Sequence, residues 1–163
     1  MNKTFLNFSL QISPEVHASF DINTARKSLI SIVEKNNYIW SNLAIPDQIH
    51  SSNVEFISKP GKYSNVDGLI TQNAKMFLTL RVADCVPVFV YDPVLKMIAL
   101  IHSGWRGTAN GIIKNSLEIM QNKGSQMQNI KIFLGPSIGK CCYEVNEEVA
   151  KRFDEKSKNK ISF

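Results

Sequence analysis

The spacing of hydrophobic residues changes from a period of two to a helical period near the start of the chain. Every second side chain from Leu6 to Ile12 is apolar and those between are polar, which predicts a half-buried strand over residues 4–12. Apolar side chains then recur three or four positions apart, which predicts a helix over residues 21–36 with Asp21 as its N-cap.

The middle of the chain consists of short apolar runs separated by turn residues, a pattern typical of consecutive strands. We expect strands at residues 38–43, 54–57, 68–71, 76–82, 86–91 and 97–101. The remainder predicts a helix at 108–122, a strand at 130–134, a loop at 135–139, a strand at 141–145 and a last helix capped by Asn146. Because strands outnumber helices and follow one another directly, we expect one mixed-sheet α+β domain over residues 1–163.

Composition indicates a globular protein with reduced thiols. Hydrophobic residues make up 44% of the chain and charged residues 20%, and no apolar run approaches the roughly 20 residues of a membrane span. The N-terminus lacks the continuous apolar segment of a signal peptide, so we expect a cytoplasmic location. Three cysteines, of which Cys141 and Cys142 are adjacent, make a poor disulfide framework. Alternation along the predicted strand places one of this pair inward and one outward, in structural roles.

The net charge of +5 raises the question of a nucleic-acid partner. Basic residues are spread along the chain, and aromatic residues do not alternate with them as a base-stacking surface requires. We therefore expect neither a nucleic-acid nor a membrane partner. A modest attraction for small anionic substrates is compatible with this charge.

The chain has three histidines, which differ in their surroundings. His17 lies in a polar stretch and is interpreted as a surface loop residue. His102 follows the apolar strand at 97–101 and precedes a Gly-Trp-Arg-Gly turn into a helix. Such a turn lets backbone N–H groups and Arg106 face an anion, although position alone favours a buried structural histidine at the end of a strand. The position of His50, taken alone, does not indicate a function.

Cys85 and the preceding Asp84 lie between two apolar runs. Free cysteine is often only a small buried hydrophobe, but a carboxylate in such surroundings needs a partner. Asp84 is a candidate to accept a ring N–H from a histidine, or to pair with Arg81 or Arg106.

Five motifs in this order resemble a known family. They are Gln48-Ile49-His50 with Val54, Val66-Asp67-Gly68-Leu69-Ile70-Thr71, Ala83-Asp84-Cys85-Val86-Pro87-Val88, His102-Ser103-Gly104-Trp105-Arg106-Gly107 and Gly135-Pro136-Ser137-Ile138-Gly139-Lys140-Cys141-Cys142-Tyr143-Glu144-Val145. Together they are similar to the laccase-domain (polyphenol oxidase, DUF152) family, regarded as purine nucleoside phosphorylases with adenosine deaminase activity.

The resemblance implies a zinc site formed by His50, Cys85 and His102, with copper as an alternative metal in the same site. Two imidazoles and a thiolate leave a fourth zinc position for water or substrate. The implied substrates are phosphate and purine nucleosides such as adenosine, inosine, guanosine or methylthioadenosine. Arg106 and Asp84 complete the expected catalytic set, and Gln48 is expected to support it. The implied fold is a layered α/β/β/α sandwich, the cytotoxic-necrotizing-factor-like cysteine hydrolase fold.

Other functions remain open at this stage. Multicopper oxidase chemistry needs far more histidines than the three present. A metal-independent amide hydrolase would use Cys85 as nucleophile and His102 as its base. The resemblance also implies segments beyond both ends of the chain, so we expect a shortened family member, and a non-catalytic remnant that binds zinc or a nucleoside is a third possibility. The oligomeric state is not indicated.

Overall fold

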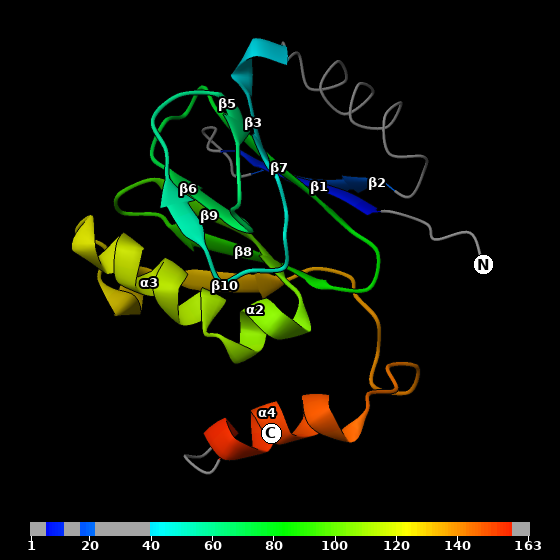
Figure 1. Ribbon diagram of the computed structural model, residues 1–163. Coiled ribbons are helices and arrows are strands. Elements are labelled where there is room, and N and C mark those ends of the chain that lie inside the picture. The colour runs from blue at the N-terminus through cyan, green and yellow to red at the C-terminus, as the bar shows by residue number, and fades with distance from the viewer. Residues whose placement is uncertain (1–5, 12–16, 22–39, 158–163) are drawn as a thin grey trace.

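Two five-stranded β-sheets packed against each other form the centre of the molecule (Figure 1). The structure, a computed structural model, describes residues 6–11, 17–21 and 40–157. The first sheet contains, in spatial order, β2 (His17–Asp21), β1 (Leu6–Gln11), β7 (Phe77–Val82), β3 (Leu43–Pro46) and β5 (Gly61–Tyr63). The second contains β10 (Lys131–Leu134), β8 (Val86–Asp92), β9 (Met97–Ser103), β6 (Gly68–Thr71) and β4 (Val54–Phe56).

Both sheets mix parallel and antiparallel pairs, as the sequence predicts. In the first sheet β1 is antiparallel to both β2 and β7, whereas β3 is parallel to β7 and β5. In the second sheet β8 is antiparallel to β9 and β10, β6 is antiparallel to β9, and β4 is parallel to β6. The mixed α+β class is therefore confirmed.

Strand β9 is buried on both faces, which explains its continuous apolar sequence. Ile98 and Leu100 belong to the core between the sheets, together with Leu78 and Leu80 of β7. The alternate residues of β9 point to the other side, where Ile101 packs in a second core. Burying each such side chain contributes about 1.5–3 kcal/mol, so β9 anchors both layers and fixes the position of His102 within it.

Helices α2 (Trp105–Ala109) and α3 (Ile112–Asn122) cover the face of the second sheet that points away from the first (Figure 1). The sequence predicts one helix here, at 108–122. The structure divides it at Gly111, whose φ of 82° is left-handed and interrupts the helix. Beyond α2 lies α4 (Glu147–Ser157), and the Asn146 side chain accepts the Val149 N–H, which confirms the predicted cap. The predicted helix at 21–36 lies outside the described residues, apart from Asp21 at the end of β2.

Four short segments depart from the predictions or add to them. A 3₁₀ helix, η1 (Trp40–Asn42), precedes β3 where a strand at 38–43 was expected, and a second, η2 (Met127–Asn129), precedes β10. His17 is not in a loop but begins β2, opposite Gln11. The predicted strand at 141–145 is wrong. The Gly139 carbonyl accepts the N–H groups of Cys142 and Tyr143, which closes a turn and leaves both cysteines exposed.

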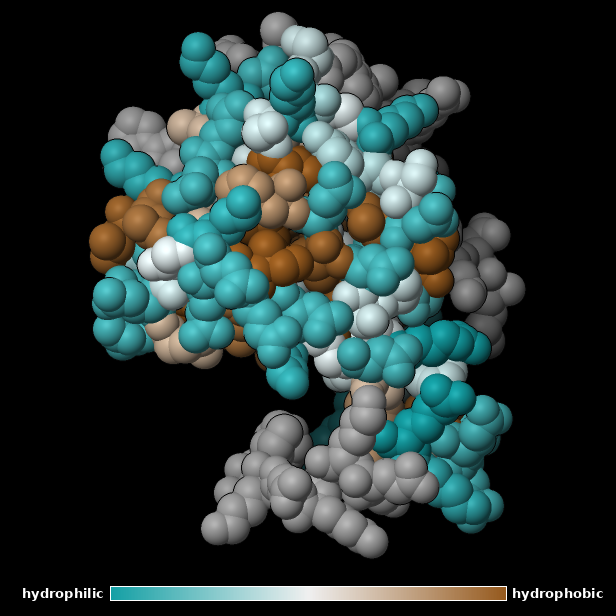
Figure 2. All heavy atoms as spheres, turned by 60° about the vertical axis from the view of Figure 1, so that its left-hand side comes forward, coloured by the Kyte–Doolittle hydropathy of each residue, from teal (hydrophilic) through white to brown (hydrophobic). Residues whose placement is uncertain are grey.

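Hydrophilic side chains cover most of the face shown in Figure 2, with hydrophobic side chains gathered in smaller patches between them. Among the exposed hydrophobic residues are Ile132, Phe133 and Leu134, which belong to β10 at the edge of the second sheet. Within the described ranges, no helix has the length and apolar character needed to cross a membrane.

Candidate metal centre

Three side chains from separate parts of the chain meet at one end of the second sheet. His50 follows β3, Cys85 lies between β7 and β8, and His102 is in β9. Their candidate ligand atoms all lie within 4.8 Å of one another. The two imidazole rings meet edge to face, with centroids 4.7 Å apart and planes at 80°. His102 is buried, Cys85 is half-buried and His50 is exposed, so the cluster has a closed floor and an open side.

A carboxylate at Asp67 organises two of these three residues. Its Oδ1 lies 2.8 Å from His102 Nδ1 and accepts the His50 backbone N–H at 2.9 Å. Its Oδ2 accepts both the backbone N–H and the hydroxyl of Ser51, each at 2.7 Å. Burial opposes ionisation of Asp67, but the hydrogen bonds from His102, Ser51 and His50 outweigh it and lower the pKa to about 2. Asp67 is thus a buried carboxylate held in its charged form.

This hydrogen bond determines which nitrogen of His102 faces the cluster. With Nδ1 donating to Asp67, Nε2 is the nitrogen available to an ion. Burial lowers the pKa of His102, but hydrogen bonds with Asp67 and Cys85 raise it to about 9. Burial and the charge of His102 lower the pKa of His50, and the positive charge of Arg106 adds to this effect. The two imidazoles of the cluster thus differ in pKa, with that of His102 raised and that of His50 lowered.

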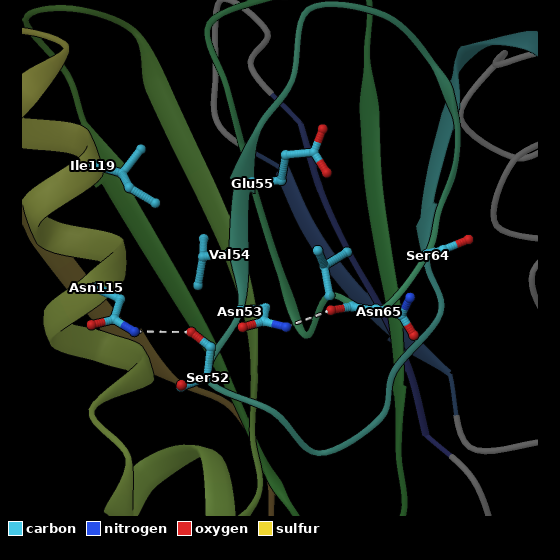
Figure 3. A pocket seen from close by; sticks show the side chains of 9 residues that line it. Ser52, Asn53, Val54, Glu55, Ser64, Asn65, Asn115 and Ile119 are labelled. Carbon is cyan, nitrogen blue, oxygen red and sulfur yellow. Dashed lines mark hydrogen bonds between the residues drawn. The ribbon is translucent and has the colours of Figure 1, made fainter.

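The loop that carries His50 is held in an uncommon conformation from several sides. His50 has a φ of 61°, in the left-handed region, and such residues gather at functional sites when their surroundings fix them. Figure 3 shows the anchors on the far side of the loop, at a pocket of about 530 Å³. Asn115 of α3 donates its side-chain N–H to the Ser52 carbonyl at 3.0 Å, and Asn53 donates to the Asn65 carbonyl at 2.9 Å.

Gly104 leaves space beside all three candidate ligands. A Cβ atom at this position would lie 3.1 Å from His50 Cδ2, 3.2 Å from Cys85 Sγ and 3.8 Å from His102 Cε1. The absence of a side chain at Gly104 therefore leaves space where the three donor atoms meet. Two imidazoles and one thiol are a donor set that suits zinc or copper. The residues present therefore fit a transition-metal ion.

A polar pocket of about 360 Å³ opens over the cluster and is lined by Asp84 and Arg81 besides the three candidate ligands. Asp84 is exposed, and within the described part of the chain its carboxylate forms no ion pair with Arg81 or Arg106. The expected bond from Asp84 to a histidine ring is absent there too, because Asp67 occupies that place. Asp84 instead lines this pocket with its side chain exposed.

The other expected residues lie around this pocket. The Gln48 side chain accepts the Arg81 N–H at 2.8 Å and donates to the Arg81 carbonyl at 2.7 Å, and so ties the His50 segment to the end of β7. Arg106 is exposed, with its guanidinium 4.2 Å from the centroid of the Trp105 ring. Asp67 and the position of Arg81 in the pocket lining were not predicted. The available signal for Asp67 was a lone carboxylate between Val66 and Gly68 in an apolar stretch.

Known proteins with similar sequences are named purine nucleoside phosphorylase or adenosine deaminase. The purine nucleoside phosphorylase RP494 of Rickettsia prowazekii is 33% identical over 99% of this chain and 66% of its own length. The adenosine deaminase RL5 of an unknown prokaryotic organism is 33% identical over 69% of this chain and 47% of its own. The crystal structure of YlmD from Geobacillus stearothermophilus superposes with a TM-score of 0.74 and 29% identity, over 77% of this chain and 50% of that one.

The chain thus spans between about half and two thirds of the length of these relatives. A family model described as multi-copper polyphenol oxidoreductase laccase matches residues 9–163. Because this match covers nearly the whole chain and the fold agrees with that of YlmD, the chain belongs to the family so described.

Proposed function

We propose that this chain is a zinc-dependent purine nucleoside phosphorylase with adenosine deaminase activity. The observation that carries the proposal is the cluster of His50, Cys85 and His102 around the space beside Gly104. The names of two relatives, a purine nucleoside phosphorylase and an adenosine deaminase, support it. Phosphorolysis converts a nucleoside and phosphate into a free base and a sugar phosphate, and deamination converts adenosine and water into inosine and ammonia.

His50, Cys85 and His102 would hold the ion as two nitrogen ligands and one sulfur ligand, with copper as the alternative metal. When bound, zinc supplies a Lewis acid that polarises an oxygen atom or activates a water molecule. Asp67 fixes the His102 ring and its tautomer, and its negative charge increases the basicity of Nε2. A cytoplasmic location suits this arrangement, because a reducing compartment keeps Cys85 as a free thiol that is available to a metal.

The proposal assigns the proton transfers to Asp84. Its exposed side chain lines the polar pocket beside Cys85, and no ion pair occupies it among the described residues. A carboxylate there accepts a proton from the attacking water during deamination and donates a proton to the departing group. Positive charge for phosphate comes from Arg81, which lines the same pocket, and from Arg106, whose charge acts on His50.

The test is turnover of adenosine in the presence and absence of phosphate, with ammonia, inosine, adenine and ribose 1-phosphate measured separately. We expect Asp84→Asn to retain its metal and to lose about 100-fold or more in rate, because general acid–base catalysis typically contributes that much. Asp47→Asn, at an exposed carboxylate outside the pocket lining, is the matched control. Turnover by Asp84→Asn at the wild-type rate would remove Asp84 from the mechanism. If the wild-type protein binds its metal but turns over none of these substrates, the proposed enzymatic activity is refuted.

A second candidate is a metal-independent cysteine hydrolase, favoured by one observation. Cys85 lies beside His102, with their candidate ligand atoms within 4.8 Å of each other, as a nucleophile and its base would. The α/β/β/α fold expected for such hydrolases has four layers. The described residues form an α/β/β arrangement, and a further helical layer would be needed to complete that fold. Amide hydrolysis that survives a chelator and stops on alkylation of Cys85 would favour this candidate over the zinc enzyme.

A further inference from the structure

A second pocket, of about 200 Å³, lies next to the polar pocket. Its aromatic wall consists of Trp105 from α2, Phe153 from α4 and Tyr143 from the connection before α4. We call this space the aromatic pocket. It gathers three aromatic rings from three segments, although neither the sequence nor the family description assigns them a role.

The chemistry of the wall selects a flat, largely apolar ligand. Tyr143 is 42% exposed and Phe153 is 37% exposed, so their rings retain surface that a ligand can cover. The hydroxyls of Ser103 and Thr108, which also line the pocket, bond to each other at 2.7 Å, and Thr108 donates further to the Gly104 carbonyl. These hydroxyls are already engaged. Aromatic side chains bind heterocyclic bases by stacking, with little dependence on their hydrogen-bond pattern.

The aromatic pocket is continuous with the metal centre through two residues. Cys85 and Asp84 line both this pocket and the polar pocket that contains His50 and His102. A ring held by the aromatic wall would thus have one edge near Cys85 and near the Asp84 carboxylate, which forms no ion pair among the described residues. The sugar or phosphate of the same molecule would extend toward Arg81 in the polar pocket.

The indole of Trp105 lies beneath two guanidinium groups. The guanidinium of Arg106 lies 4.2 Å from its centroid, and that of Arg152 lies 5.7 Å away. The two cations favour a substrate that carries negative charge or that binds together with an anion.

We infer that the aromatic pocket is the subsite for the purine ring of the substrate. In this arrangement Trp105, Tyr143 and Phe153 contact the ring faces and edges, and Asp84 accepts a hydrogen bond from an N–H group of the base. The inference rests on the proposed function for the identity of the whole nucleoside. Binding of the ring does not depend on turnover, so the subsite and the proposed function can be tested separately.

The chain has two tryptophans, so a Trp40→Phe background leaves Trp105 as the sole indole reporter. We expect adenine and adenosine to quench its fluorescence with saturation, and ribose to have no effect. Adding Phe153→Ala should weaken adenine binding about 10-fold, because one stacking contact is lost. Phe133→Ala, at an exposed aromatic residue of β10 outside the pocket, is the matched control and should leave binding unchanged.

The same variants in the wild-type background separate the two proposals. If the inference holds, Phe153→Ala raises the KM for adenosine about 10-fold while metal content stays at the wild-type level. Turnover with an unchanged KM in both Phe153→Ala and Tyr143→Ala would overturn the subsite and leave the proposed function intact. Saturable adenine binding that is weakened by Phe153→Ala, in protein without turnover, would support the subsite and refute the proposed function. Quenching by ribose equal to that by adenine would also overturn the subsite.

Discussion

Substitution of Gly104 by alanine tests whether the space beside the three candidate ligands is needed for a metal. The added methyl group would lie 3.1 Å from His50 Cδ2 and 3.2 Å from Cys85 Sγ, whereas favourable carbon contacts begin at about 3.5 Å. The two side chains must therefore move by a few tenths of an ångström. Metal–ligand distances tolerate only about 0.2 Å, so the displacement is comparable with the whole tolerance of the site.

The backbone at this position accepts alanine without strain, which separates the metal from the fold. Gly104 has φ −74° and ψ 163°, an extended conformation open to any residue. Replacing glycine at such a site reduces the entropy of the unfolded chain and stabilises by about 0.4–1 kcal/mol. This gain offsets part of the steric cost. We expect the free energy of unfolding of metal-free Gly104→Ala to lie within about 1 kcal/mol of the wild-type value.

Zinc affinity is expected to fall about 10- to 100-fold in Gly104→Ala, a range seen when the groups that orient metal ligands are lost. Competition with a fluorescent chelator measures the affinity, and urea unfolding of metal-free protein measures stability. Gly139→Ala is the matched control, because its Cβ would make only an ordinary 3.6 Å contact with Cys141 Sγ. Wild-type zinc affinity in a folded Gly104→Ala protein would refute the steric reasoning.

Three further predictions concern polar groups that are buried or half-buried. Asp67→Asn removes the negative charge that accepts hydrogen bonds from the N–H groups of the His50 loop and from His102. The free energy of unfolding, measured by urea titration, should therefore fall by about 3 kcal/mol. A loss below about 1 kcal/mol would contradict this. Asn115→Ala removes the bond to the Ser52 carbonyl and should cost about 1 kcal/mol and weaken zinc binding, whereas Gln121→Ala on the same helix should change neither quantity. The pKa of Asp92 is lowered, because hydrogen bonds that include those from the Leu95 and Val94 N–H groups outweigh the opposing effect of burial. Its contribution to stability is therefore present above about pH 4 and is lost as the pH falls further. Asp92→Asn keeps an acceptor for these N–H groups, and its unfolding free energy should fall less steeply than that of the wild type between pH 5 and pH 3; equal slopes would exclude Asp92 as a source of acid lability.

The central strands were predictable from the sequence because their signals are local. β6, β8 and β9 are apolar runs bounded by turn residues, and the predicted ranges differ from the observed ones by at most two residues at either end. β5 was not predictable, because it has three residues, lies at a sheet edge and buries none of them fully. The segment at 141–145 has the alternation of a strand, but a strand also needs a partner, and the turn closed by Gly139 prevents one from forming.

The candidate ligands were identified through motifs, whereas the carboxylate that orients one of them was assigned to the wrong aspartate. Asp84 and Asp67 both lie between apolar residues, so the same argument from burial applied to each. Which one is enclosed depends on tertiary packing. Asp67 immediately precedes β6 and contacts His102 across the sheet, while Asp84 lies in an exposed connection. Sequence pattern alone does not contain this difference.

The most direct test of the central claim is the metal content of purified protein after exposure to zinc and removal of the excess. The site predicts about one zinc per chain in the wild type and in Cys141→Ser, and a loss of most of it in Cys85→Ser. Cys141 is the matched control because it is a free thiol outside the cluster. Equal zinc in Cys85→Ser and Cys141→Ser, or no zinc in the folded wild-type protein, would contradict a metal centre formed by His50, Cys85 and His102.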